Sequence, residues 1–148
     1  MSEFKHIVRI KGKDLDGSKK LVAALADLKG VGLNLAYAII NALRLDPKAR
    51  LGFLSDAEIN EIEKGLSDPT RLGIPSWKLN RRKSADTGLN YHLVGVDLDL
   101  AVKNDIEREK MIGSWRGIRH SLGLKVRGQR TRTTGRKGRT VGVRKSAA

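Results

Sequence analysis

The sequence has no cysteine among its 148 residues. Disulfides, thiolate metal ligands and cysteine nucleophiles are therefore excluded, and the absence agrees with a reducing compartment. Aromatic residues make up only 4% of the chain against 39% hydrophobic residues. This composition permits an aliphatic core but argues against a large aromatic-walled pocket for a small-molecule substrate.

Long hydrophobic runs are also absent. Leu35 to Ile40, an uninterrupted apolar run, is far shorter than the roughly 20 residues that cross a bilayer. The N-terminus lacks the apolar segment of a secretory signal. We expect a cytosolic protein with no membrane association, built as one domain of ordinary size with an appendage.

Acidic residues are missing from the C-terminal part of the chain, where every Asp and Glu lies at or before Glu109. Nineteen basic residues balance the sixteen acidic ones before Met111, and eleven basic residues follow. A nearly neutral body therefore carries a polycationic end. Those eleven residues are Arg116, Arg119, Lys125, Arg127, Arg130, Arg132, Arg136, Lys137, Arg139, Arg144 and Lys145.

The segment from Val126 to Lys145 has eight basic residues, four glycines and no carboxylate. Ordering a residue costs roughly 1–2 kcal/mol, and three valines are too few to offset that cost, so the segment cannot order itself. A solubilising disordered extension is one interpretation. A membrane-surface helix is not, because Leu, Phe and Trp are absent. A polyanion is the natural partner, and the excess of Arg over Lys favours folded RNA while leaving DNA open.

Hydrophobic periodicity predicts short elements in the first half of the chain. Phe4 to Ile10 is typical of a brief strand. Ser18 is expected to cap a helix from Lys19 to Leu28, and a second helix follows the KGVG stretch, Lys29 to Gly32, until Asp46 and Pro47 stop it. The sequence therefore predicts two helices joined by a glycine hairpin.

Two further helices are predicted downstream. Ser55 and Glu58 form a capping box for a helix ending near Ser67, with Ile59, Ile62 and Leu66 inward and Glu61, Glu63 and Lys64 toward water. The weakly periodic segment 69–95 permits a small β-hairpin around SADTG. Asp97 or Asp99 begins the last long helix, through about Ile112, with an Asp99 to Lys103 pair outside.

Two motifs outside the tail have both a structural and a functional interpretation. Lys29, Gly30 and Gly32 either join packed helices or offer amides to a phosphate, as in helix-hairpin-helix modules. The basic cluster Lys78, Arg81, Arg82 and Lys83 is either a solvated hairpin face with Trp77 in the core, or a second RNA contact. Trp115 is expected in the core.

Catalytic and metal-binding patterns are lacking. His6, His92 and His120 show no metal-ligand spacing, and the acidic residues near Asp56 look like a helix cap and a solvated face. No phosphate-binding loop of the Walker type occurs. We therefore expect no metal, no cofactor, no small-molecule substrate and no enzymatic activity.

The run RGIRHSLGLKVRGQRTRTTGR, Arg116 to Arg136, resembles the C-terminal signature of the small-ribosomal-subunit protein family thirteen. The resemblance extends to IVRIKGKDL, residues 7–15, and to LKGVGLNLAYAI, residues 28–39, so it covers nearly the whole chain. DPTRLGIPSWKLNRRK and TTGRKGRTVGV look like segments of archaeal and eukaryotic members, which favours an archaeal source. Lys125 and Thr134-Gly135 depart from the bacterial pattern of proline and Asn-Ala.

The resemblance implies a mainly α fold: a globular body, residues 1–115, with a helix-two-turn-helix element, a short N-terminal strand and the 69–95 insertion, followed by an extended basic arm, residues 116–148. It implies a structural protein of the small-subunit head that binds ribosomal RNA. Further implied partners are peptidyl-site transfer RNA, small-subunit protein family nineteen and, as an intersubunit bridge contact, large-subunit protein five.

Carried onto this sequence, the resemblance assigns RNA-contacting roles to the arm, with its last cations nearest the transfer RNA. The predicted RNA-binding residues are Arg116, Arg119, His120, Lys125, Arg127, Gly128, Gln129, Arg130, Thr131, Arg132, Arg136, Lys137, Arg139, Arg144 and Lys145. A helix-hairpin-helix DNA protein and a nuclease or glycosylase that shares the hairpin are the competing hypotheses. The second of these lacks a visible catalytic set.

Overall fold

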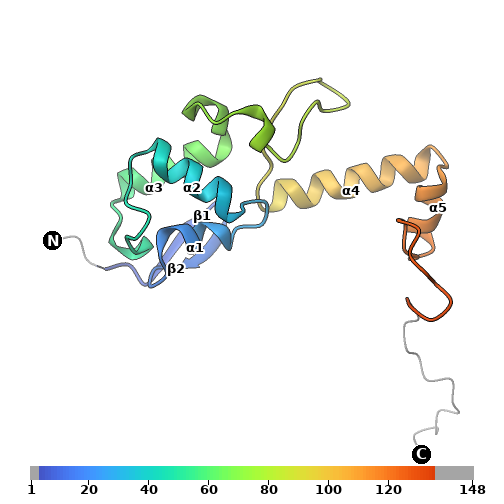
Figure 1. Ribbon diagram of the computed structural model, residues 1–148, viewed down its shortest axis with the longest axis horizontal. Helices are drawn as coiled ribbons and strands as arrows, with labels where there is room; N and C mark the ends of the chain where they lie inside the picture. Colours follow the sequence, from blue (N-terminus) through green and yellow to red (C-terminus); the bar gives the residue numbers. More distant parts are fainter. Residues whose placement is uncertain (1–3, 136–148) are drawn as a thin grey trace, which may run out of the picture. The chain divides into compact units, whose positions relative to one another are not determined.

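A two-stranded antiparallel hairpin opens the fold in the computed structural model, which describes residues 4–135 (Figure 1). Strand β1 (Ile7–Ile10) pairs with β2 (Lys13–Asp16), with Ile10 opposite Lys13. Lys11 and Gly12 both have positive φ, as a two-residue turn between twisted strands requires. The first strand confirms the prediction. The second was missed because its residues, KDLD, bury only Leu15.

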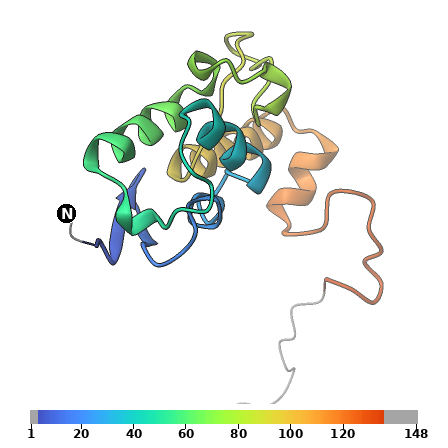
Figure 2. The same cartoon turned by 60° about the vertical axis from the view of Figure 1, so that its left-hand side comes forward.

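The predicted helical hairpin is confirmed. Helix α1 (Leu21–Ala26) and helix α2 (Leu33–Ala42) pack against each other and lie side by side in both views (Figure 1, Figure 2). The predicted Ser18 cap is wrong, because α1 begins later, with Lys20 preceding it and no side-chain cap. The chain before α1 instead pairs with a distant segment: the Leu21 amide donates to the Ala49 carbonyl at 2.8 Å.

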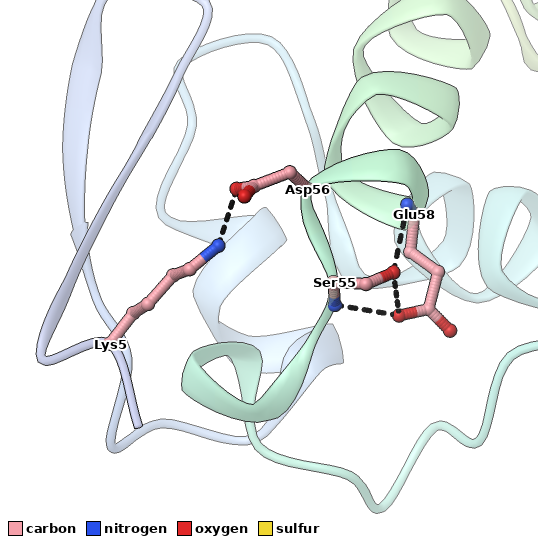
Figure 3. A network of polar contacts seen from close by, with 4 residues as sticks. All are labelled: Lys5, Ser55, Asp56 and Glu58. Carbon is pink, nitrogen blue, oxygen red and sulfur yellow. Dashed lines mark hydrogen bonds and ion pairs between the residues drawn. The ribbon is translucent and has the colours of Figure 1, made fainter. Parts of the chain in front are cut away.

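Helix α3 (Asp56–Ser67) begins with the predicted capping box. The Glu58 amide donates to Ser55 Oγ at 3.3 Å, and the Ser55 amide donates to Glu58 Oε2 at 2.8 Å (Figure 3). Figure 3 also shows the ion pair between Lys5 and Asp56, which joins the N-terminal segment to the same helix end. Glu63 does not face water as predicted, because it accepts a hydrogen bond of 2.9 Å from the Lys11 amide in the β-hairpin turn.

The core is aliphatic. Side chains from the hairpin, from helices α1, α2 and α3 and from the 3₁₀ helix η1 (Leu51–Phe53) meet in one buried cluster. None of the buried hydrophobic residues of the described chain is aromatic. The most completely buried large side chains are Ile10, Leu21, Leu25, Ile39, Ile40, Leu51, Ile62, Leu66 and Pro69.

The insertion, residues 69–95, contains 3₁₀ helices η2 (Pro69–Leu72) and η3 (Ser76–Lys78). The predicted hairpin is reduced to one isolated antiparallel bridge, in which Arg81 and Tyr91 exchange backbone hydrogen bonds of 3.2 and 2.9 Å. A longer ladder does not form because asparagine side chains take up the neighbouring backbone groups. Asn80 accepts from the Leu93 amide and Asn90 accepts from the Lys83 amide.

Two helices follow the insertion, α4 (Val96–Met111), as predicted, and α5 (Trp115–Ser121). Asp99 forms its ion pair with Lys29 rather than with the predicted Lys103. No residue of α4 is fully buried. The prediction that Trp115 lies in the core is wrong, since 72% of this residue is exposed.

Residue contacts divide the described chain after Ala101 into two compact units. The first contains the hairpin, α1 to α3, the insertion and the start of α4, and the second contains the rest of α4, α5 and the following coil. The boundary expected at residue 115 stays a prediction of the sequence. Within residues 4–135, no helix is long and apolar enough to span a bilayer.

Replacing Ser55 with Ala removes the oxygen that accepts from the first turn of α3. We expect the free energy of unfolding to fall by about 1 kcal/mol, the usual value of a helix N-cap. Ser18→Ala is the matched control, since Ser18 caps no helix, and it should lower the stability less. Chemical denaturation of both variants measures the difference, and an equal loss would contradict the assignment of the caps.

Candidate nucleic-acid interface

The predicted RNA-binding residues of the described arm lie on α5 and on the coil that follows it. Ser114 starts α5 by accepting a hydrogen bond from the Gly117 amide at 3.0 Å, and its own hydroxyl donates to the Glu109 carbonyl at 3.2 Å. The cap turns the chain sharply after α4, so a Cβ on buried Gly117 would lie 2.2 Å from the Glu109 carbonyl oxygen. Local bonding therefore sets where the arm begins.

Among the described residues, the coil from Gly123 to Gly135 forms hydrogen bonds only within itself and with α5. Arg119 Nε donates to the Lys125 carbonyl at 2.6 Å, and the Arg127 amide donates to the Gln129 side chain at 3.0 Å. Only Val126 is partly buried in this stretch, and Gly128 has a φ of +73° that suits glycine. The arm therefore presents its backbone and its side chains to solvent.

No ion pair neutralises the described cations of this arm. Among residues 4–135, no ion pair involves Arg116, Arg119, Lys125 or the arginines of the coil, Arg127, Arg130 and Arg132. Arg119 instead places its guanidinium 5.7 Å from the centre of the exposed Trp115 ring. His120, Gln129 and Thr131 lie along the same segment. Uncompensated guanidinium groups beside glycine-rich backbone are suited to bind phosphates.

An open groove of about 620 Å³ lies within the second unit, between the end of α4, α5 and the start of the coil. Arg116, His120 and Arg127 line it together with the carboxylates Asp105 and Glu109. The mixed charge makes this groove a weaker anion site than the coil beyond it.

The predicted last contacts of the arm lie outside the described residues. They are Arg136, Lys137, Arg139, Arg144 and Lys145.

The KGVG turn is built into the body. The Lys29 carbonyl accepts from the Gly95 amide at 2.8 Å, and the Lys29 ammonium is paired with Asp99. Gly30 has a φ of +95°, and a Cβ there would lie 2.5 Å from the Leu93 carbonyl oxygen. Gly32 caps the start of α2 with open space around it. Contacts within the body thus account for Lys29 and Gly30. Phosphate binding by the turn stays a prediction, and Gly32 is the residue of the turn with open space for it.

His92, which has no metal-ligand spacing in the sequence, connects the insertion to this turn. Its Nε2 lies 2.9 Å from the Gly30 carbonyl oxygen, and its Nδ1 accepts from the Asn80 amide at 3.2 Å. The ring is therefore neutral, with its proton on Nε2. Burial lowers the pKa of His92, and the hydrogen bond to Gly30 opposes that shift. No sequence spacing marks this role, because the partners are 62 and 12 residues away.

The second basic cluster lies on the insertion. Arg82 and Lys83 are exposed, while Lys78 and Arg81 are partly buried. The interpretation that placed Trp77 in the core is wrong, because 65% of this residue is exposed and Lys78 Nζ lies 5.3 Å from its ring centre. The other interpretation, a second RNA contact, stays a prediction. Within residues 4–135, no three His, Asp or Glu residues are arranged to hold a metal ion.

Comparison with known proteins decides the family. A family model described as ribosomal protein S13/S18 matches residues 9–137. The chain belongs to this family. The small ribosomal subunit protein uS13 from Staphylothermus marinus is 63% identical to this chain over 142 residues, which cover 96% of this chain and 94% of that protein. The uS13 of Saccharolobus solfataricus is 62% identical over 147 residues, covering 99% and 89%.

A more distant relative, the uS13 of Methanocaldococcus jannaschii, is 50% identical over 142 residues, covering 96% of this chain and 95% of that protein. These matches confirm the predicted resemblance and the archaeal type of the chain. The family is a structural, non-enzymatic ribosomal component, so the prediction that the chain is not an enzyme is confirmed. The nuclease and glycosylase hypotheses are thereby set aside.

Gly30→Ala should destabilise the body strongly. A side chain at this φ is strained, at about 1–3 kcal/mol, and the clash with the Leu93 carbonyl adds to that loss. Gly32→Ala is the matched control, with open space at Cβ and a φ of −99°, and should cost less than about 1 kcal/mol. Denaturant unfolding compares the two. Similar losses would show that Gly30 is not packed against the insertion.

Stability should fall in mild acid because of His92. The pKa of His92 is lower in the folded chain than its ordinary value of 6.5. Above pH 6.5 the contribution of His92 to the free energy of unfolding is therefore constant. Below it the unfolded chain takes up a proton that the folded chain resists, and stability is lost as the pH falls. Unfolding free energies of the wild type and of His92→Gln between pH 7.5 and 5.5 measure this. The variant should show the shallower slope, and equal slopes would contradict the buried neutral ring.

Proposed function

We propose that this member of the S13/S18 family is a structural constituent of the head of the small ribosomal subunit, which binds ribosomal RNA through its C-terminal arm. A structural ribosomal role follows from the family itself. The protein is located in the cytoplasm, within the small ribosomal subunit. The RNA-binding role of individual arm residues is the part that needs support from the chain's own chemistry.

The observation that carries the proposal is the set of uncompensated cations on the exposed coil. Arg127, Arg130 and Arg132 are exposed and form no ion pair within residues 4–135. The coil around them makes only local hydrogen bonds, so its backbone can adapt to a phosphate chain. RNA would supply both the negative charge and the contacts that the coil lacks, and the arm would take its final form on assembly.

The finer partners rest on the family resemblance. The arm is proposed to contact peptidyl-site transfer RNA through its last cations, and the body is proposed to contribute to intersubunit bridges with large-subunit protein five. Small-subunit protein family nineteen is the proposed neighbour in the head. The exposed apolar residues of α5, Ile118 and Trp115, are available for a protein contact of that kind.

Replacing Arg127, Arg130 and Arg132 together with Gln should weaken binding to a transcript of the small-subunit head RNA. The slope of log affinity against log salt should become shallower by up to about 2–3, since each lost phosphate contact contributes roughly 0.7–0.9. The triple Lys variant is the matched control, because it keeps the charge and should keep the slope. Filter binding over a salt series measures both.

A slope that is unchanged in the Gln variant would contradict the assignment of these residues to RNA. Deleting Val126 to Ala148 provides a second check. The truncated body should melt as cooperatively as the full chain while its RNA affinity falls, because every buried hydrophobic residue among 4–135 lies before the deletion. Tighter binding of the full chain to plain duplex DNA than to the transcript, at equal salt, would favour the DNA-binding alternative.

A further inference from the structure

An exposed tryptophan is the feature of the first unit that the arm does not explain. Trp77 is 65% exposed, although the residues on either side of its short 3₁₀ helix are buried: Ile74 is 6% exposed and Leu79 is 5% exposed. An indole ring is among the most favourable groups to bury. The body therefore holds the ring outside its core while anchoring the chain on both sides of it.

The backbone that carries Trp77 is fixed by short-range bonds. Pro75 precedes helix η3, the Lys78 amide donates to the Pro75 carbonyl at 3.0 Å, and the Leu79 amide donates to the Ser76 carbonyl at 3.2 Å. The segment then continues into Asn80, whose amide is held by His92. A ring on such a support loses little conformational freedom on binding, which is a property of a preorganised contact.

The surroundings of Trp77 are cationic. Residues 69–95 contain five basic residues and a single acidic one, Asp86. Lys78 Nζ lies 5.3 Å from the centre of the indole ring. Arg82 and Lys83 are exposed and follow Trp77 within six residues, a span of at most about 20 Å. An apolar protein partner would leave these charges unpaired, whereas a nucleic-acid strand would match both the ring and the charges.

We propose that Trp77 is a stacking platform for an unpaired RNA base, with Lys78, Arg82 and Lys83 gripping the adjacent phosphates. A π-face accepts any base, and the cations hold the backbone, so the pair of features fits a looped or bulged nucleotide rather than a regular duplex. This inference rests on the proposed function, and it adds a base contact on the insertion that is separate in sequence from the arm.

The test uses the full chain with Trp115→Phe, so that Trp77 is the only tryptophan. A transcript of the small-subunit head RNA should quench Trp77 fluorescence on binding, because a base lies against the ring. Inorganic polyphosphate, which has charge but no bases, should bind without quenching. Binding itself is followed separately by the anisotropy of labelled RNA.

Substitution of the ring gives the second readout. Trp77→Leu should weaken transcript binding by roughly 5- to 100-fold, the range of one lost stacking contact, while Trp77→Phe retains most of the affinity. Both variants should melt as the wild type does, since the side chain is largely exposed.

The outcomes separate this proposal from the function proposed above. If the transcript binds while Trp77 fluorescence is unchanged, or if the Leu and Phe variants bind equally well, the stacking platform is wrong and the ring is assigned to a protein contact. If the transcript fails to bind the full chain at all, the RNA-binding function itself is overturned together with this inference.

Discussion

Aliphatic burial ends at Val94, and the rest of the molecule follows from that limit. Every buried hydrophobic residue of the described chain lies at or before this position, and every carboxylate lies at or before Glu109. The apolar side chains farther along, such as Trp115 and Ile118, are exposed, so their burial does not offset the loss of chain entropy. The coil that follows α5, residues 123–135, has no fully buried hydrophobic side chain and no acidic side chain of its own. This distribution supports the proposal that the arm depends on an external polyanion.

The body also holds an insertion, residues 69–95, that has almost no regular secondary structure. Residues 69–95 contribute Ile74, Leu79 and Val94 to burial, and the His92 ring joins their backbone to the glycine turn between α1 and α2. The turn needs glycine at position 30 because the insertion lies against it. Helical hairpin and insertion therefore stabilise each other, so the turn's structural use limits how much of it is left for a ligand.

Much of the fold could be predicted from the sequence where the signal is local. The capping box at Ser55 and Glu58, the glycine turn and the long helix near Asp99 all depend on residues within a few positions of each other. Predictions failed where distant residues decide. Ser18 does not cap α1 because the Leu21 amide bonds to Ala49, and Asp99 turns to Lys29 instead of to its helical neighbour.

The candidate site divides in the same way. The cationic arm could be predicted from the composition, and the match to the family model confirms that the chain is a ribosomal protein. The prediction for Trp115, and the core interpretation of Trp77, failed because hydrophobicity alone predicts burial, whereas both residues are 65% or more exposed beside a cation. The role of His92 could not be inferred at all, because its partners are backbone groups brought together only by the tertiary fold.

The claim that the arm acquires its order from RNA is tested most directly by amide hydrogen exchange. Amides from Gly128 to Gly135 should exchange within the dead time in the free chain and should slow when the small-subunit head RNA is bound. The α3 amides should be protected equally in both states. Arm amides that are already protected in the free chain, at the level of α3, would contradict the account.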